Sequence, residues 1–269
     1  MTDSSGRAHL LPDAALYERL GEPLTAQCIP HAFEAVGGIA AGTEVLDVAS
    51  GPGGLSVAAA ELGARVVATD ISEAMVARAA QRLAPHPACS ATVMDAQALD
   101  IGDHTVDIAF SMFGIINLPE WRTALREMAR VTRPGGRGCI SSWKDPRTVG
   151  SVALLVEAMA EVFPEREPVP LPEGVLLAAD VDALHREMAG AGFRDVTVRP
   201  VQLTWAGPTM ARFRADIDEV FGFLPPFTGL SPEERERLTP ALTAAAQRRA
   251  GADGSLIVAT TAHLAVGRV

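Results

Sequence analysis

The chain has 269 residues, of which 48% are hydrophobic, so it is long and apolar enough for one large domain with a substantial core. Its net charge is −10 at pH 7, which argues against nucleic acids and anionic membranes as partners. The three cysteines, Cys28, Cys89 and Cys139, have spacings that fit neither a zinc site nor a disulfide framework. Because the sequence shows no signal peptide and no membrane segment, we expect a cytoplasmic protein, and we expect no bound metal.

Residues 12–38 precede the first strand pattern and are predicted to form one or two amphipathic helices. Leu16, Leu20 and Leu24 recur near the helical period. Tyr17, the only tyrosine in the chain, could lie at the boundary between a helix and the core or contact a bound ligand.

A short apolar strand that runs into a glycine-rich turn occupies residues 44–54. The run at 45–49 predicts a buried parallel strand, and a helix rich in alanine begins at residue 55. Gly51, Gly53 and Gly54 let the turn adopt positive φ and let a ligand approach the backbone without meeting a Cβ. The pattern is typical of the first half of a βαβ unit.

Two acidic residues indicate what this turn binds. Asp47 interrupts the buried strand, where a carboxylate needs a cation or a hydrogen-bond donor and would repel a pyrophosphate. Asp70 ends the second predicted strand, residues 65–70, where it can accept hydrogen bonds from ribose hydroxyls. The predicted ligand is a nucleoside that carries a positive group.

Strands and helices alternate along the rest of the chain, which predicts an α/β fold. Ser72 is placed to cap the helix after the second strand, and Ser231 and Glu234 form a capping box. Further strands are predicted at residues 91–94, 106–111, 137–143, 196–205 and 255–266. Further helices are predicted at residues 120–131, 149–162, 182–191 and 210–223.

Four segments in this order resemble the motifs of the class I S-adenosylmethionine-dependent methyltransferases. They are residues 45–54 (VLDVASGPGG), 67–75 (VATDISEAM), 94–99 (MDAQAL) and 130–136 (RVTRPGG). The chain departs from the family at positions 49 and 50, where alanine and serine replace the usual cysteine or glycine. The resemblance is to the small-molecule type, similar to the ubiquinone and menaquinone methyltransferases.

This resemblance implies a Rossmann-like, mostly parallel sheet of seven strands with helices on both faces. The implied strand order is 3-2-1-4-5-7-6, with strand 7 antiparallel. Residues 1–38 would form a helical lid over the cofactor, and residues 39–269 the methyltransferase domain. Segments 145–180 and 207–253 would be insertions at the acceptor site.

The resemblance also implies S-adenosylmethionine as cofactor, with S-adenosylhomocysteine as product. Asp95 and the amide of Ala96 would meet the edge of the adenine. Ile71 and Met75 could lie on either side of its ring, or could simply pack in the core. The implied cofactor contacts are Asp47, Ala49, Gly51, Gly53, Asp70, Ile71, Met75, Asp95, Ala96 and Ser111.

The acceptor is predicted to be a small, largely apolar molecule. Residues 111–119, after the fourth strand, lack the Asn-Pro-Pro-aromatic or Asp-Pro-Pro-aromatic signature of nucleic-acid amino-methylases. The predicted pocket residues are Tyr17, Met112, Phe113, Trp143 and Phe221, although Trp143 could equally pack in the core. The apolar side chains of segment 207–253 either cover this pocket or pack against a second copy in a homodimer.

The implied reaction is in-line transfer of a methyl group from sulfur to a nucleophile, which requires no covalent enzyme intermediate. A hydroxyl acceptor would need a base, and His31 is the first candidate, although a surface or structural role suits it as well. His263, within the last predicted strand, is expected to be a core residue. The reaction is expected to belong to secondary metabolism.

Two other functions compete with methyl transfer. A nicotinamide oxidoreductase is opposed by Asp47, by Ser56 in place of the third glycine, and by the absence of a Tyr-x-x-x-Lys pair. A protein that binds S-adenosylmethionine without methylating, as a structural, sensing or assisting group, would keep the same motifs and stays open.

Overall fold

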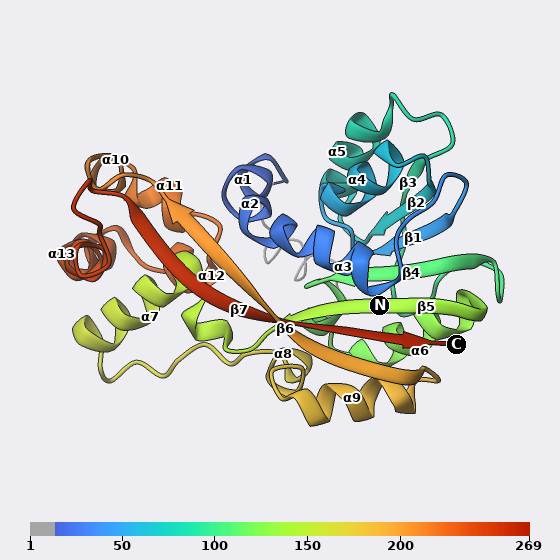
Figure 1. Ribbon diagram of the computed structural model, residues 1–269. Helices are drawn as coiled ribbons and strands as arrows, with labels where there is room; N and C mark the ends of the chain where they lie inside the picture. The colour runs from blue at the N-terminus through green and yellow to red at the C-terminus, as the bar shows by residue number, and fades with distance from the viewer. Residues whose placement is uncertain (1–13) are drawn as a thin grey trace, which may run out of the picture. The chain divides into compact units, whose positions relative to one another are not determined.

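The computed structural model describes residues 14–269 and contains a seven-stranded sheet of order β3-β2-β1-β4-β5-β7-β6 (Figure 1). The strands are β1 (Glu44–Val48), β2 (Arg65–Asp70), β3 (Ser90–Val93), β4 (Val106–Met112), β5 (Thr132–Trp143), β6 (Arg194–Gly207) and β7 (Leu256–Arg268). Neighbours from β3 through β5 pair in parallel, whereas β7 pairs antiparallel with β5. The predicted Rossmann-like class and strand order are confirmed.

Helices connect the strands and occupy most of the remaining chain. Their bounds are α1 (Ala14–Leu20), α2 (Glu22–Thr25), α3 (Ile29–Ala35), α4 (Gly54–Glu61), α5 (Glu73–Leu83), α6 (Trp121–Val131), α7 (Gly150–Val162), α8 (Glu173–Leu177), α9 (Val181–Gly190), α10 (Met210–Ala215), α11 (Ile217–Phe221), α12 (Pro225–Thr228) and α13 (Pro232–Gln247). Both predicted caps are confirmed. The Ser72 hydroxyl accepts from the N–H of Met75, and Ser231 and Glu234 cap each other at α13.

The described chain forms two compact units. The sheet unit holds residues 25–144, 171–201 and 262–269, and the insertion unit holds the chain up to residue 24, residues 145–170 and residues 202–261. The segment predicted as a lid is therefore divided between the units after residue 24, and its part before residue 14 lies outside the described residues. The lid and the boundary after residue 38 stay predictions.

Helix α6 supplies much of the core of the sheet unit. Its buried residues Trp121, Leu125 and Met128 recur at helical spacing and form one stripe, which packs with strand residues such as Leu46 and Ile140. All three cysteines are free, and two of them are buried. Because one face of α6 is anchored in this core, side chains on its other face can hold neighbouring loops in place.

The insertion unit has an aromatic core of its own. Phe213, Phe221 and Phe227 are fully buried, and the ring centroid of Phe221 lies 5.8 Å from that of Phe213 and 5.4 Å from that of Phe227. Such pairs stabilise beyond the area that they bury. At least these rings of segment 207–253 thus find partners within their own unit.

Three predicted elements differ from the structure. The single helix predicted at residues 210–223 is two short helices, because the backbone of Asp216 leaves the helical region at φ −117° and ψ 30°. From residue 14 onward the N-terminal segment forms three short α-helices rather than one or two, separated by Gly21 and by a 3-10 turn at Ala26–Cys28. Strand β5 begins at Thr132 instead of 137, and its register with β4 shifts around Gly135, whose φ is 83°.

Candidate functional site

The turn between β1 and α4 has an unusual backbone. Ala49, Gly51 and Gly53 all have positive φ, of 54°, 56° and 85°. Positive φ was predicted at Gly51, Gly53 and Gly54, and the prediction is wrong for Gly54, which is the first residue of α4. At Ala49 a positive φ is costly, because the residue has a Cβ, and it marks stored strain. A Cβ on Gly53 would also lie 3.0 Å from the Cβ of Ala79 in α5, so the close packing of the two favours glycine there as well.

Asp70 lies directly beside this turn. Its Oδ2 accepts from the N–H of Gly51 at 2.9 Å, and its Oδ1 accepts from the N–H of Ser72 at 2.9 Å. Burial raises the pKa of Asp70 above its ordinary value, while hydrogen bonds from Ser72, Gly51 and Ile71 oppose that shift. The carboxylate is oriented by the backbone, and its remaining lone pairs can accept from a bound hydroxyl pair.

Asp47 is buried and meets a donor from its own chain. Its Oδ2 accepts from the hydroxyl of Ser56, in the first turn of α4, at 2.6 Å. The sequence identified Ser56 only as a departure from a third glycine, so this partner was missed. The signal was present, since a hydroxyl nine residues beyond a buried carboxylate can reach it across a strand–turn–helix unit.

Ser56→Ala should lower the free energy of unfolding by about 1–2 kcal/mol, because a hydrogen bond to a buried carboxylate is lost. Urea unfolding of the two proteins would measure the difference. Ser90→Ala, at an exposed position in β3, is the matched control and should change little. Equal stability of the Ser56 variant and the natural protein would contradict the structural role of this hydrogen bond.

Ile71 and Met75 differ in exposure. The side chain of Ile71 is 43% exposed, whereas Met75 is only 5% exposed and belongs to the inward face of α5. Of the two roles predicted for this pair, core packing suits Met75 and contact with a ligand ring suits Ile71. Both cofactor contacts stay predictions.

Asp95 follows the end of β3 and opens a tight turn. Its Oδ1 accepts from both the backbone N–H and the side-chain amide of Gln97, each at 2.9 Å. Among residues 14–269, its Oδ2 has no hydrogen-bond partner, so this oxygen can accept from an exocyclic amine. Ala96 is buried beside it.

The turn after β4 packs directly against the glycine-rich turn. A Cβ on Gly114 would lie 2.6 Å from the Cβ of Ala49 and 2.8 Å from its carbonyl oxygen, so only glycine allows this approach. Ser111 is buried, and its hydroxyl accepts from the N–H of Ile115 at 3.1 Å. The sequence placed Ser111 in the site but missed Gly114.

An aromatic pair lies at the same edge of the sheet. The rings of Phe113 and Trp143 stack with centroids 4.1 Å apart and planes 21° apart, and Met112 beside them is half-buried. Phe113 has a positive φ of 59°, and its N–H donates to the hydroxyl of Ser141 at 3.0 Å. This strained conformation is held by Ser141, a residue that sequence reasoning missed.

The remaining predicted residues lie on α3, in β7 and in the insertion unit. His31 is exposed on α3, and its carbonyl oxygen accepts from Arg199. Tyr17 and Phe221 belong to the insertion unit, the first half-buried and the second buried, so their place at an acceptor pocket stays a prediction. His263 is buried in β7, as expected of a core residue, although its Nδ1 lacks a hydrogen-bond partner among residues 14–269.

Within the described part of the chain, no three His, Cys, Asp or Glu side chains gather to hold a metal ion. No helix from residue 14 onward has both the length and the apolar character to cross a bilayer.

The candidate site consists of a strained turn, two oriented carboxylates and an aromatic pair at the carboxyl ends of β1 to β5. Such a site defines an α/β protein that binds a nucleoside cofactor.

Comparison with known proteins identifies the family. A family model described as a methyltransferase domain matches residues 45–136. The demethylmenaquinone methyltransferase of Mycolicibacterium paratuberculosis is 34% identical over 171 residues, covering 60% of this chain and 72% of that protein. The chain belongs to the class I S-adenosylmethionine-dependent methyltransferases, of small-molecule type, and its cofactor is S-adenosylmethionine. The predicted resemblance is confirmed.

Solved structures agree on the fold. A putative methyltransferase from Bacillus halodurans is similar with a TM-score of 0.57 and 16% identity, over 90% of this chain and 98% of that one. Phosphoethanolamine N-methyltransferase 2 of Haemonchus contortus, solved with S-adenosyl-L-methionine, has a TM-score of 0.52 at 18% identity, over 90% and 52% of the two chains.

Proposed function

We propose that the protein methylates a small, planar, largely apolar acceptor, a quinone-like compound of secondary metabolism. The observation that carries the proposal is the stacked pair of Phe113 and Trp143, beside the turn that packs on Ala49. Trp143 is only half-buried, so it can offer part of its indole to a flat ring. The relatives named demethylmenaquinone methyltransferase support an acceptor with a quinone-like ring.

The insertions support an acceptor that differs from that of these relatives. The alignment with the Mycolicibacterium protein covers 60% of this chain, so a large part of the chain lies outside the aligned region. Segments that differ between relatives are typical places for acceptor selectivity. We assign the reaction to secondary metabolism on this ground, with a homodimer as an alternative use of the apolar insertion at 207–253.

The residues of the site would act by alignment. When bound, S-adenosylmethionine supplies a methyl group on a positively charged sulfur, so the donor is already activated. Asp70 would hold the ribose hydroxyls, and Asp95 with Ala96 the adenine edge, while Ile71 covers the ring. Orientation and exclusion of water contribute on the order of 7–11 kcal/mol in well-aligned reactions, and no side chain needs to form a bond.

A hydroxyl acceptor would also have to lose a proton, and His31 is the residue we propose for this step. Its side chain is exposed on α3, in the same unit as the glycine-rich turn. His31→Asn would leave cofactor affinity unchanged and lower kcat if the imidazole takes that proton. If kcat of His31→Asn equals that of the natural protein around neutral pH, His31 is not the base. The proposed class of acceptor would be unaffected.

The function is tested by incubating the protein with methyl-deuterated S-adenosylmethionine and a panel of naphthoquinols, phenols and aliphatic amines. Mass spectrometry should find the labelled methyl on a planar ring compound, and fragmentation would locate the methylated atom. A metabolite extract from a strain that lacks the gene extends the search to natural acceptors. Label on aliphatic amines alone would contradict the proposal. If the cofactor binds but no labelled product forms, a protein that binds S-adenosylmethionine without methylating is favoured.

A further inference from the structure

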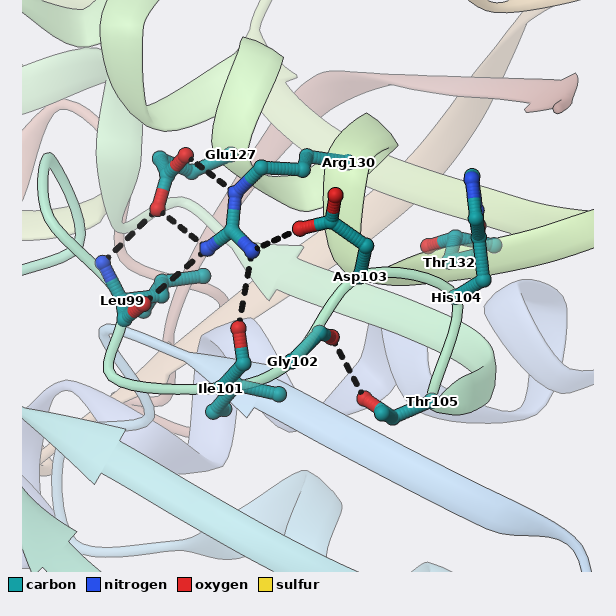
Figure 2. Close-up of polar contacts among 9 residues, drawn as sticks. All are labelled: Leu99, Ile101, Gly102, Asp103, His104, Thr105, Glu127, Arg130 and Thr132. Carbon is teal, nitrogen blue, oxygen red and sulfur yellow. Dashed lines mark hydrogen bonds and ion pairs between the residues drawn. The ribbon is translucent and has the colours of Figure 1, made fainter.

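The loop that follows Asp95 is tied to α6 through a single side chain. Figure 2 shows the guanidinium of Arg130, in the last turn of α6, among the backbone and side chains of residues 99–103. Nε donates to Oε1 of Glu127 at 2.7 Å, and Nη2 donates to its Oε2 at 2.7 Å and to the carbonyl of Leu99 at 3.0 Å. Nη1 donates to the carbonyl of Ile101 at 2.8 Å and to Asp103 at 2.6 Å.

These bonds occupy all five N–H donors that a guanidinium possesses. Lysine could not replace them, because its donors lie on one atom and do not form a planar fork. Two of the five acceptors are backbone carbonyls of the loop, so Arg130 holds the course of the chain itself.

Glu127 also binds the backbone of Leu99. Its Oε2 accepts from the N–H of Leu99 at 2.9 Å while also accepting from Arg130. The hydrogen bonds from Arg130 and from the Leu99 amide lower the pKa of Glu127, so its carboxylate stays charged at neutral pH. Both polar backbone groups of Leu99 are thus held by one ion pair, and its side chain is buried in the core.

Leu99 also lies at the end of the tight turn that begins at Asp95. The N–H of Ala98 donates to the carbonyl of Asp95 at 3.0 Å, and Gln97 is bonded to its carboxylate. At the other end, the N–H of Met94 donates to the carbonyl of Asp70 at 2.9 Å. The position of Asp95 is therefore set from two sides, by the end of β2 and by the ion pair on α6.

We propose that Glu127 and Arg130 are positioning residues that hold the 95–103 loop so that Asp95 and Ala96 select adenine over other purines. The proposal rests on the proposed role of Asp95 and Ala96 at the adenine edge. It assigns to the ion pair a function in ligand selectivity and not only in stability.

Backbone hydrogen bonds beyond the loop make the effect local. The N–H of His104 donates to the carbonyl of Arg130, and the N–H of Thr105 donates to that of Val131. These bonds do not involve the Arg130 side chain. Truncating that side chain should therefore loosen residues 95–103 while β4 and α6 stay folded.

Selectivity is measured as a ratio, the dissociation constant of S-inosylhomocysteine divided by that of S-adenosylhomocysteine. S-inosylhomocysteine has an oxo group in place of the exocyclic amine. In Arg130→Met, calorimetry should show S-adenosylhomocysteine binding about tenfold more weakly, as for a mispositioned hydrogen bond to a charged group, with S-inosylhomocysteine little changed. The ratio should fall by a similar factor. Glu127→Gln keeps the shape of the side chain and part of its hydrogen bonding. Its selectivity ratio should lie between those of the natural protein and Arg130→Met.

Arg133→Met is the matched control. Its guanidinium forms an ion pair with Asp107 at 2.6 Å, also close to the end of α6, but none of its contacts reach the loop. This variant should keep the natural ratio, and urea unfolding of both variants gives their stabilities. The proposal would be overturned if Arg130→Met weakened the binding of both ligands equally or of neither. A merely structural role would change the free energy of unfolding without changing the selectivity ratio.

Asp95→Ala separates this inference from the function on which it rests. If Asp95→Ala loses selectivity and Arg130→Met keeps it, the adenine role stands and the positioning role is wrong. If Asp95→Ala keeps selectivity, the adenine role of Asp95 is wrong and the inference falls with it. Loss of selectivity in both variants, with the control unchanged, supports the proposal.

Discussion

Replacing Trp121 with alanine should lower the free energy of unfolding by about 3–5 kcal/mol, the usual loss for removing a buried large aromatic side chain. Trp121 begins α6, is 0% exposed, and belongs to the core of the sheet unit. The backbone of α8 packs closely on it, since a Cβ on Gly174 would lie 2.9 Å from the Cγ of Trp121. Because the backbone of α8 and the helix α6 itself border Trp121, they cannot move fully into the cavity that Trp121→Ala would leave.

Urea unfolding followed by circular dichroism measures this loss, with Trp143→Ala as the comparison. Trp143 is half-buried and stacks on a single ring, so its removal should cost less stability. A loss in Trp121→Ala no larger than that in Trp143→Ala would contradict the role of Trp121 as the core anchor of α6.

Asp70→Asn should weaken S-adenosylmethionine binding by about 1–3 kcal/mol, because a charge-assisted acceptor becomes a neutral amide. The amide would also place a donor toward the N–H of either Gly51 or Ser72, which now donate to the carboxylate. Calorimetry measures the change directly. Asp107→Asn is the matched control, since Asp107 also accepts from a backbone N–H, that of Glu44 at 2.9 Å, at the start of β1. Unchanged binding in Asp70→Asn would remove Asp70 from the site.

The same carboxylate predicts how binding depends on pH. Burial raises the pKa of Asp70, so in the free protein this group takes up a proton at a higher pH than an exposed aspartate does. The protonated acid is a poorer acceptor, so cofactor affinity should fall as the pH is lowered through that pKa and should be regained above it. Dissociation constants measured from neutral to acid pH should show this fall, and Asp70→Asn should flatten it. If the affinity of the natural protein does not fall toward acid pH, the prediction is wrong. If the same fall persists in Asp70→Asn, another group causes it.

The sequence by itself was enough for the fold class and, through the resemblance of its four motifs to a known family, for the strand order and the cofactor. The positive φ of Gly51 and Gly53 and the place of Asp70 at the end of β2 could be predicted, because they depend on local backbone chemistry and on where a parallel strand ends. Ser72 and Ser231 were predicted as caps for the same reason, since a cap bonds to residues only three positions away.

Pairings between distant residues were decided by the tertiary structure alone. Arg130 meets Leu99, 31 residues before it, and Phe113 meets Trp143 across two strands. Such contacts depend on strand register and helix placement, which residue spacing does not specify. The break at Asp216 likewise follows from packing, because the local pattern favoured one continuous helix. Local chemistry therefore determined what the site binds, and packing decided which side chains hold it in position.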